Sequence, residues 1–185
     1  MSGRNGSIAV NPKTTLFFLT GGLNDGFLRT TTTIANLSGE IRFLYLAGAR
    51  NFSVALLPTK IPPFHHVAER LNPAIVGIPR NLQSELPGAR IIVNRWGPGF
   101  DEVISSRSDY GTTNITRPCA AGREVFGENE APCDRPDTYF YYQDGHPSIA
   151  VHRIVGRKVA TEIAMSSTSK FRATIASRNQ LYEVC

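Results

Sequence analysis

The sequence predicts an α/β protein with a parallel β-sheet, and two observations lead to this prediction. Short apolar runs at residues 14–22, 51–58 and 89–96 are typical of strands that are buried along their whole length. Segments in which apolar residues recur at helical spacing alternate with these runs along the chain. Strands that alternate with helices form parallel sheets covered on both faces. We therefore expect a three-layer α/β/α sandwich, whose functional sites lie at the C-terminal ends of the strands.

Two helices are expected between the first and third strands. The first follows a run of four threonines, with Thr33 as its N-cap and Gly48 at its end. Its apolar stripe comprises Ile34, Leu37, Ile41, Leu44 and Tyr45. The second helical pattern covers residues 64–86 and is expected to be interrupted at Pro73 and Pro79, because proline lacks an amide hydrogen. Its stripe comprises Val67, Leu71, Ile75, Ile78 and Leu82.

The remaining chain is expected to hold a short helix, a loop, an extended piece and a closing helix. These cover residues 99–111, 112–137, 138–142 and 147–164. Pro147 suits the first position of the closing helix, where its missing amide hydrogen is harmless. The apolar stripe of that helix comprises Val151, Ile154, Val155, Val159 and Ile163. Cys119 and Cys133 bracket part of the loop, so a local disulfide is expected there in an oxidising compartment.

The composition is that of a globular domain, with 41% hydrophobic and 19% charged residues among 185. No apolar stretch is long enough to span a bilayer, and the first residues contain no secretory signal, so the localisation is left unknown. Residues 151–185 hold six basic and two acidic side chains, whereas the preceding 150 residues hold 14 and 13. We expect no nucleic-acid partner for the nearly neutral body; a basic tail that binds an anionic surface is the alternative.

Two short motifs contain the candidate functional residues. In GGLND the glycines permit a tight turn and Asn24 offers an amide donor, a group that stabilises oxyanions; the alternative is a turn that caps the local backbone. In QDGHPS, Asp144 stands two residues before His146 and is a candidate to orient it as a general base; the alternative is a surface turn. Both motifs follow extended runs, so we expect them to face each other at one edge of the sheet.

The other histidines are not expected to take part in the chemistry. His152 lies on the closing helix and is interpreted as a packing or solvated residue. His65 and His66 are adjacent, and because neighbouring side chains diverge, no metal site is expected there. The sequence therefore predicts neither a metal nor another cofactor.

Together, the two motifs resemble blocks of the SGNH, or GDSL-type, lipases and acylhydrolases. A strand followed by Gly22-Leu23-Asn24-Asp25 resembles block III of that family, Gly-x-Asn-Asp. DGHPSIAVH resembles block V, in which the catalytic histidine precedes proline and serine or threonine at a helix start. The intervening segments ANLSGEIRFLYLAGARNFSVALLP and FDEVISSRSDYGTTNITRPC are also similar to the family. The resemblance covers residues 12–164.

The resemblance implies a three-layer α/β/α fold and an esterase or lipase activity. The family hydrolyses carboxylic esters of small molecules, lipids and carbohydrates without a metal or cofactor. Asn24 matches the asparagine of its oxyanion hole, and His146 matches the catalytic histidine that activates a serine. Asp25 would then have a local structural role.

The chain departs from the family pattern at two places. The family's acid stands three residues before the histidine, where this chain has Gln143. Asp144 serves as the acid only if the turn is one residue tighter; otherwise a neutral amide or a carbonyl orients His146. In addition, no Gly-Asp-Ser occurs in the chain, and Ser7 in NGSIA, its nearest imitation, follows no apolar strand.

These departures lead to an expected domain plan. We expect a flexible N-terminus at residues 1–11, a partial SGNH domain at 12–164 and a basic tail at 165–185. The first strand and its crossover are expected to be missing, which leaves a sheet edge for self-association. The expected function is that of a truncated, catalytically impaired esterase whose complete parent is secreted or periplasmic. The alternative is a non-catalytic fragment or binding module that retains the scaffold.

Overall fold

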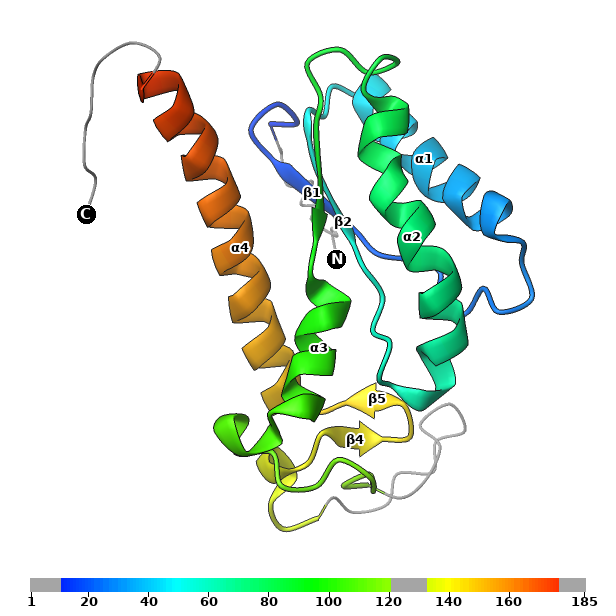
Figure 1. The fold of residues 1–185 in the computed structure, drawn as a ribbon, viewed down its shortest axis with the longest axis vertical. Helices are drawn as coiled ribbons and strands as arrows, with labels where there is room; N and C mark the ends of the chain where they lie inside the picture. Colours follow the sequence, from blue (N-terminus) through cyan, green and yellow to red (C-terminus); the bar gives the residue numbers. More distant parts are fainter. Residues whose placement is uncertain (1–10, 121–132, 177–185) are drawn as a thin grey trace, which may run out of the picture. The chain divides into compact units, whose positions relative to one another are not determined.

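The computed structural model describes residues 11–120 and 133–176, with side chains placed as far as residue 166. The described chain is an α/β structure with a three-stranded parallel sheet, a two-stranded hairpin and four α-helices (Figure 1). The chain divides into two compact units, one formed by Met1–Leu56 and His66–Val93 and the other by Leu57–His65 and Asn94–Cys185. The alternation of strands and helices along the chain is compatible with a three-layer α/β/α fold.

The parallel sheet has the strand order β1-β2-β3, with bounds Leu16–Leu19, Asn51–Ala55 and Arg90–Asn94. Leu16 of β1 lies opposite Asn51 of β2, and Leu19 lies opposite Val54. The central strand β2 is buried from its second residue to its last, as an apolar run in a parallel sheet should be. All three strands were expected from the sequence, and each is shorter than its apolar run.

Helices α1, Thr30–Leu46, and α2, His65–Leu82, lie side by side in Figure 1. The predicted N-cap of α1 is wrong: the helix starts at Thr30, and Thr33 is buried in its first turn. The Thr33 hydroxyl donates a hydrogen bond to Asp25 Oδ2 at 2.7 Å, so a tertiary contact determines its place. The predicted end is confirmed, because Gly48 follows the helix with a φ of 101°, a backbone conformation that favours glycine.

The predicted interruption of α2 is also wrong, because the helix continues through Pro73 and Pro79. A proline inside a helix costs about 3 kcal/mol. Each fully buried aliphatic side chain returns about 1.5–3 kcal/mol. The buried stripe of α2 therefore outweighs both prolines; it comprises Ala68, Leu71, Ile75, Ile78 and Leu82.

The second unit is built around α3, Trp96–Ser105, and α4, Ile149–Ala176, which lie side by side (Figure 1). They approach closely at Gly99, where an added Cβ would lie 3.1 Å from Val155 Cγ1. The core of this unit contains Ile61, Phe100, Val103, Phe140, Tyr141, Val151, Val155 and Val159. Short 3-10 helices complete the unit: η1 at Pro62–Phe64, η2 at Arg107–Tyr110 and η4 at Pro136–Thr138.

The closing helix α4 starts two residues later than predicted. Pro147 lies in β5, His146–Pro147, which pairs antiparallel with β4, Tyr141–Gln143. Ser148 then precedes the helix, and its Oγ accepts a long hydrogen bond of 3.4 Å from Val151 N. A serine that can satisfy an amide of the first turn therefore occupies the cap position, and α4 continues past residue 164 to Ala176.

Cys119 and Cys133 form a disulfide, as the bracketed loop suggests. The sequence between residues 121 and 132 lies outside the described residues, as do residues 1–10 and 177–185 of the expected N-terminus and tail. Within the part that the structure describes, no helix is long and apolar enough to cross a membrane.

Candidate functional site

Asn24 is presented by a tight turn that follows β1. Asp25 N donates to the carbonyl of Gly22 at 2.9 Å, and Gly22 has a φ of 106°, which glycine adopts without steric cost. The Asn24 side chain is exposed, and its amide makes no hydrogen bond to the described residues. The turn thus leaves an amide donor facing solvent.

The loop that follows Asn24 is held by charged and hydroxyl groups. The Asp25 carboxylate accepts from the Thr33 hydroxyl at 2.7 Å, which ties the loop to α1. Arg70 on α2 donates to the carbonyls of Asp25 and Leu28 at 3.0 and 2.9 Å and to the Thr30 hydroxyl at 3.0 Å. Asp25 therefore has the local structural role that the resemblance implies, and the loop is anchored to both helices of its unit.

His146 is oriented by a hydrogen bond within its own hairpin. Its Nδ1 lies 2.9 Å from the main-chain oxygen of Asp144. A carbonyl oxygen only accepts, so Nδ1 carries the hydrogen, and in this tautomer of the neutral imidazole Nε2 carries the lone pair. The turn depends on Gly145, whose φ is 73°. The exposed ring thus has a fixed orientation, in which Nε2 can accept a proton.

The hydrogen-bond partner of His146 is the main-chain carbonyl of Asp144 and not the Asp144 carboxylate. The sequence left open whether an acid or a neutral group orients this ring, and in the structure the neutral group does so. A carbonyl fixes the tautomer as a carboxylate would, but it gives less stabilisation to the imidazolium that forms on proton transfer. Burial raises the pKa of the Tyr141 phenol, and the negative charge of Asp144 raises it further.

Gln143 is buried in β4, opposite His146, at the position where the resemblance to the SGNH family implies an acid. Its Nε2 is buried without a hydrogen-bond partner among the described residues. A buried polar group in this state costs about 1–3 kcal/mol. Sequence reasoning noted only the absence of an acid at this position, since no local pattern reports an unpaired amide.

A surface cavity of about 510 Å³ lies beside this hairpin. It is mostly apolar, and its lining comprises Tyr142, Gln143, His146, Pro147, Ile149 and His152. The ring of His152 packs edge-on against Phe100 with a centroid distance of 5.3 Å, while the residue as a whole is exposed, so both parts of its interpretation as a packing or solvated residue apply. Partial burial in this contact lowers the pKa of His152.

The expected site residues belong to two compact units of the chain. His146, Asp144 and Gln143 lie together on the β4–β5 hairpin, whereas Asn24 follows β1 in the other compact unit. The extended run before QDGHPS does not join the parallel sheet, because β4 pairs only with β5 in a separate two-stranded sheet of the described chain. Ser7 lies outside the described residues.

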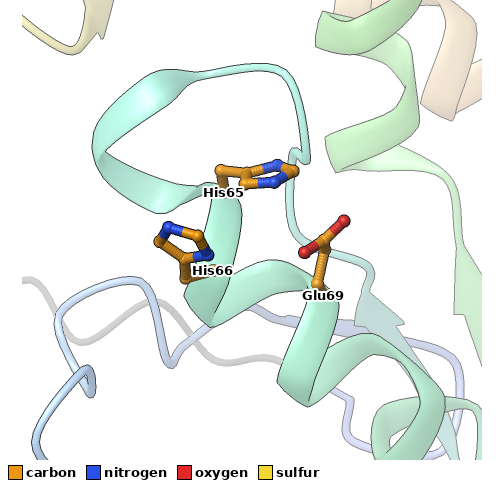
Figure 2. Close-up of side chains that lie close together, drawn as sticks. All are labelled: His65, His66 and Glu69. Atoms are coloured by element: carbon orange, nitrogen blue, oxygen red, sulfur yellow. The ribbon is translucent and has the colours of Figure 1, made fainter.

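One cluster of potential metal ligands is present among the described residues, on the first turn of α2 (Figure 2). Ligand atoms of His65, His66 and Glu69 all lie within 4.8 Å of one another. The adjacent histidines diverge less than expected, since their ligand atoms lie within 4.8 Å of one another, and the sequence interpretation overlooked Glu69 as a third potential ligand.

Comparison with known proteins gives a coarse relationship. No family model matches the chain. A GDSL esterase/lipase of Arabidopsis thaliana is 26% identical over 83 residues, which are 42% of this chain and 22% of the relative. The chain thus aligns with about a fifth of that relative's length. The similarity supports a GDSL-like relationship for part of the chain.

Proposed function

We propose that this chain contributes the acid–base residue of a carboxylic ester hydrolase of the SGNH type. The supporting observation is the hydrogen bond from His146 Nδ1 to the Asp144 carbonyl, which leaves Nε2 ready to accept a proton beside an apolar cavity. The partial similarity to a GDSL esterase/lipase and the order of the two motifs support the ester class.

In the proposed reaction, His146 moves one proton in each half of the acyl transfer. Nε2 takes the hydroxyl proton of the nucleophile as its oxygen bonds to the acyl carbon. The protonated ring then returns that proton to the alcohol as the ester bond breaks. Asn24 is proposed as a donor to the oxyanion formed between these steps, since its exposed amide makes no competing hydrogen bond to described residues.

The nucleophile of the proposed enzyme is a serine in a Gly-Asp-Ser segment, and no such segment occurs in these residues. We expect the chain alone to be catalytically impaired, with His146 activating water toward reactive esters. Supplying a Gly-Asp-Ser segment from the same family in trans is expected to raise the rate.

The test is ester hydrolysis by the full chain and by His146→Ala, with p-nitrophenyl acetate as substrate. A general base contributes about 10²–10⁴-fold, so His146→Ala is expected to remove nearly all protein-dependent hydrolysis. His152→Ala is the matched control, because His152 lines the same cavity without the bond to Asp144. Equal rates for the original chain and His146→Ala would contradict the proposal.

A second candidate function is a binding module that retains the scaffold without catalysis. The observation that favours it is the buried Gln143 amide at the position of the family's acid, which leaves His146 without a negatively charged partner there. This candidate predicts no hydrolysis above the buffer rate, even when the Gly-Asp-Ser segment is supplied.

A further inference from the structure

The first turn of α2 presents two imidazoles and one carboxylate in one small volume. His65, His66 and Glu69 place their ligand atoms within 4.8 Å of one another (Figure 2). Residues three and four positions apart share a helix face, so Glu69 is a neighbour of both histidines. All three residues lie within the first five residues of α2, and the helix backbone itself therefore sets their spacing.

The ring of His65 is already oriented for coordination. Its Nδ1 lies 2.7 Å from the carbonyl oxygen of Thr59, which can only accept a hydrogen bond. The hydrogen is therefore on Nδ1, and the lone pair is on Nε2. A metal-bound histidine characteristically donates its other ring nitrogen to a carbonyl or carboxylate, which fixes the tautomer and the ring plane.

The carbonyl that holds His65 is itself held in place. The Asp101 carboxylate accepts from Thr59 N at 2.9 Å, from Thr59 Oγ1 at 2.7 Å and from Lys60 N at 2.8 Å. The short helix η1, with Pro62 and Pro63, then leads directly into α2. A chain of hydrogen bonds thus runs from Asp101 on α3 through Thr59 to the His65 ring and fixes the orientation of that ring.

The other two ligands lie at the surface of the helix, where His66 and Glu69 are exposed. Both also have other interactions in the structure, and an ion must compete with these. In a tetrahedral zinc site with bonds of about 2.0–2.1 Å, ligand atoms lie roughly 3.4 Å apart. Side-chain rotation of His66 and Glu69 brings their ligand atoms from within 4.8 Å to this shorter separation, while His65 keeps its orientation.

We propose that His65, His66 and Glu69 bind one Zn²⁺ ion. Two imidazole nitrogens and a carboxylate oxygen suit zinc, whereas calcium and magnesium prefer sites made of oxygen alone. The Glu69 carboxylate also offsets the repulsion between a cation and the positive N-terminal end of the helix dipole. Three protein ligands leave the fourth position for water or an exogenous ligand. The site shares no residue with the His146 hairpin and does not depend on the esterase proposal.

The test is calorimetric titration of the full chain with zinc chloride after dialysis against EDTA and then metal-free buffer. One zinc per chain is expected. His66→Ala and Glu69→Gln are each expected to raise the dissociation constant for zinc at least tenfold. Glu40→Gln on α1 is the matched control, because Glu40 is exposed and lies outside the cluster, and its dissociation constant should equal that of the original chain.

Two results would overturn the proposal. The first is an absence of saturable zinc binding by the full chain, which would show that the cluster does not close. The second is an unchanged dissociation constant in both His66→Ala and Glu69→Gln, which would place any bound ion elsewhere. Circular dichroism of each variant checks that the fold is retained, and both substituted residues are exposed. Zinc should raise the unfolding temperature of the original chain and leave that of Glu69→Gln nearly unchanged.

Discussion

His146 Nδ1 donates a hydrogen bond to the main-chain oxygen of Asp144 at 2.9 Å. The side chain of residue 144 is therefore not what orients the imidazole, although the sequence made it the obvious candidate. The same backbone bond persists whatever side chain stands at this position, provided that the turn is retained. A substitution that removes only the carboxylate therefore tests whether the carbonyl or the carboxylate of Asp144 supports an activity that depends on His146.

We predict that Asp144→Asn changes the His146-dependent rate of ester hydrolysis less than about threefold. Asparagine suits turns as aspartate does and keeps the carbonyl. Neutralising a carboxylate that holds a catalytic histidine costs about four orders of magnitude in a serine-protease triad. Steady-state kinetics of Asp144→Asn beside the original chain decide the matter, and a loss of a hundredfold or more would assign the orienting role to the carboxylate.

The unpaired amide of Gln143 leads to a stability prediction. Gln143→Met keeps the length of the side chain and removes the buried Nε2, which has no partner in the described structure. Replacing an unsatisfied polar group by an apolar one of similar shape is expected to raise the free energy of unfolding by about 1 kcal/mol. Urea unfolding at neutral pH measures this change. A loss of stability would mean that the amide is satisfied by a group outside the described residues or by water.

The parallel sheet was predictable because the hydrophobic pattern within each strand is enough to identify it. A run such as residues 51–58 is apolar throughout, and that pattern alone distinguishes a buried parallel strand from a half-exposed one. Helix starts were less accessible: four successive threonines offer equivalent caps, and the contact of Thr33 with Asp25 determines which one is buried. The continuity of α2 through Pro73 depends on tertiary burial of its other face.

The site was predictable as a set of residue types and not as an arrangement. The motif identified His146, but the choice between the carbonyl and the carboxylate of Asp144 depends on the left-handed turn at Gly145. The burial of Gln143 depends on hairpin pairing, which no local pattern in TYFYYQ specifies. The cluster at His65 was rejected from the divergence of adjacent side chains, an argument that ignores a third ligand one turn later.

A pair of glycine substitutions tests the packing of α3 on α4. Gly99→Ala places a Cβ 3.1 Å from Val155 Cγ1 in a buried contact, and overpacking of this kind costs about 1–3 kcal/mol. The gain in helix propensity, about 0.5–1 kcal/mol, does not cover it. We therefore expect a net loss of about 1 kcal/mol in the free energy of unfolding.

Gly156→Ala is the matched control on the facing helix. An added Cβ at Gly156 meets nothing within 4 Å, so only the propensity gain of about 0.5–1 kcal/mol remains. Chemical denaturation of the two variants should therefore give changes of opposite sign. If both variants gain stability, the close approach of α3 and α4 at Gly99 is not present in solution.

The pH dependence of stability provides a test of the contact between His152 and Phe100. Burial lowers the pKa of His152 in the folded chain, whereas the unfolded chain titrates near the ordinary value of about 6.5. Between these two pKa values the unfolded state binds more protons than the folded state, and stability therefore falls as the pH is lowered through that window. Above about pH 6.5 the ring is neutral in both states and the contact contributes fully.

We predict that His152→Gln abolishes this component of the pH dependence. The free energy of unfolding of the original chain should decrease more steeply between pH 7.5 and pH 5 than that of the variant, with the difference opening below about pH 6.5. Urea unfolding at several pH values measures both slopes. Parallel curves for the two proteins would show that the ring is as well solvated in the folded chain as in the unfolded one, which would contradict the prediction.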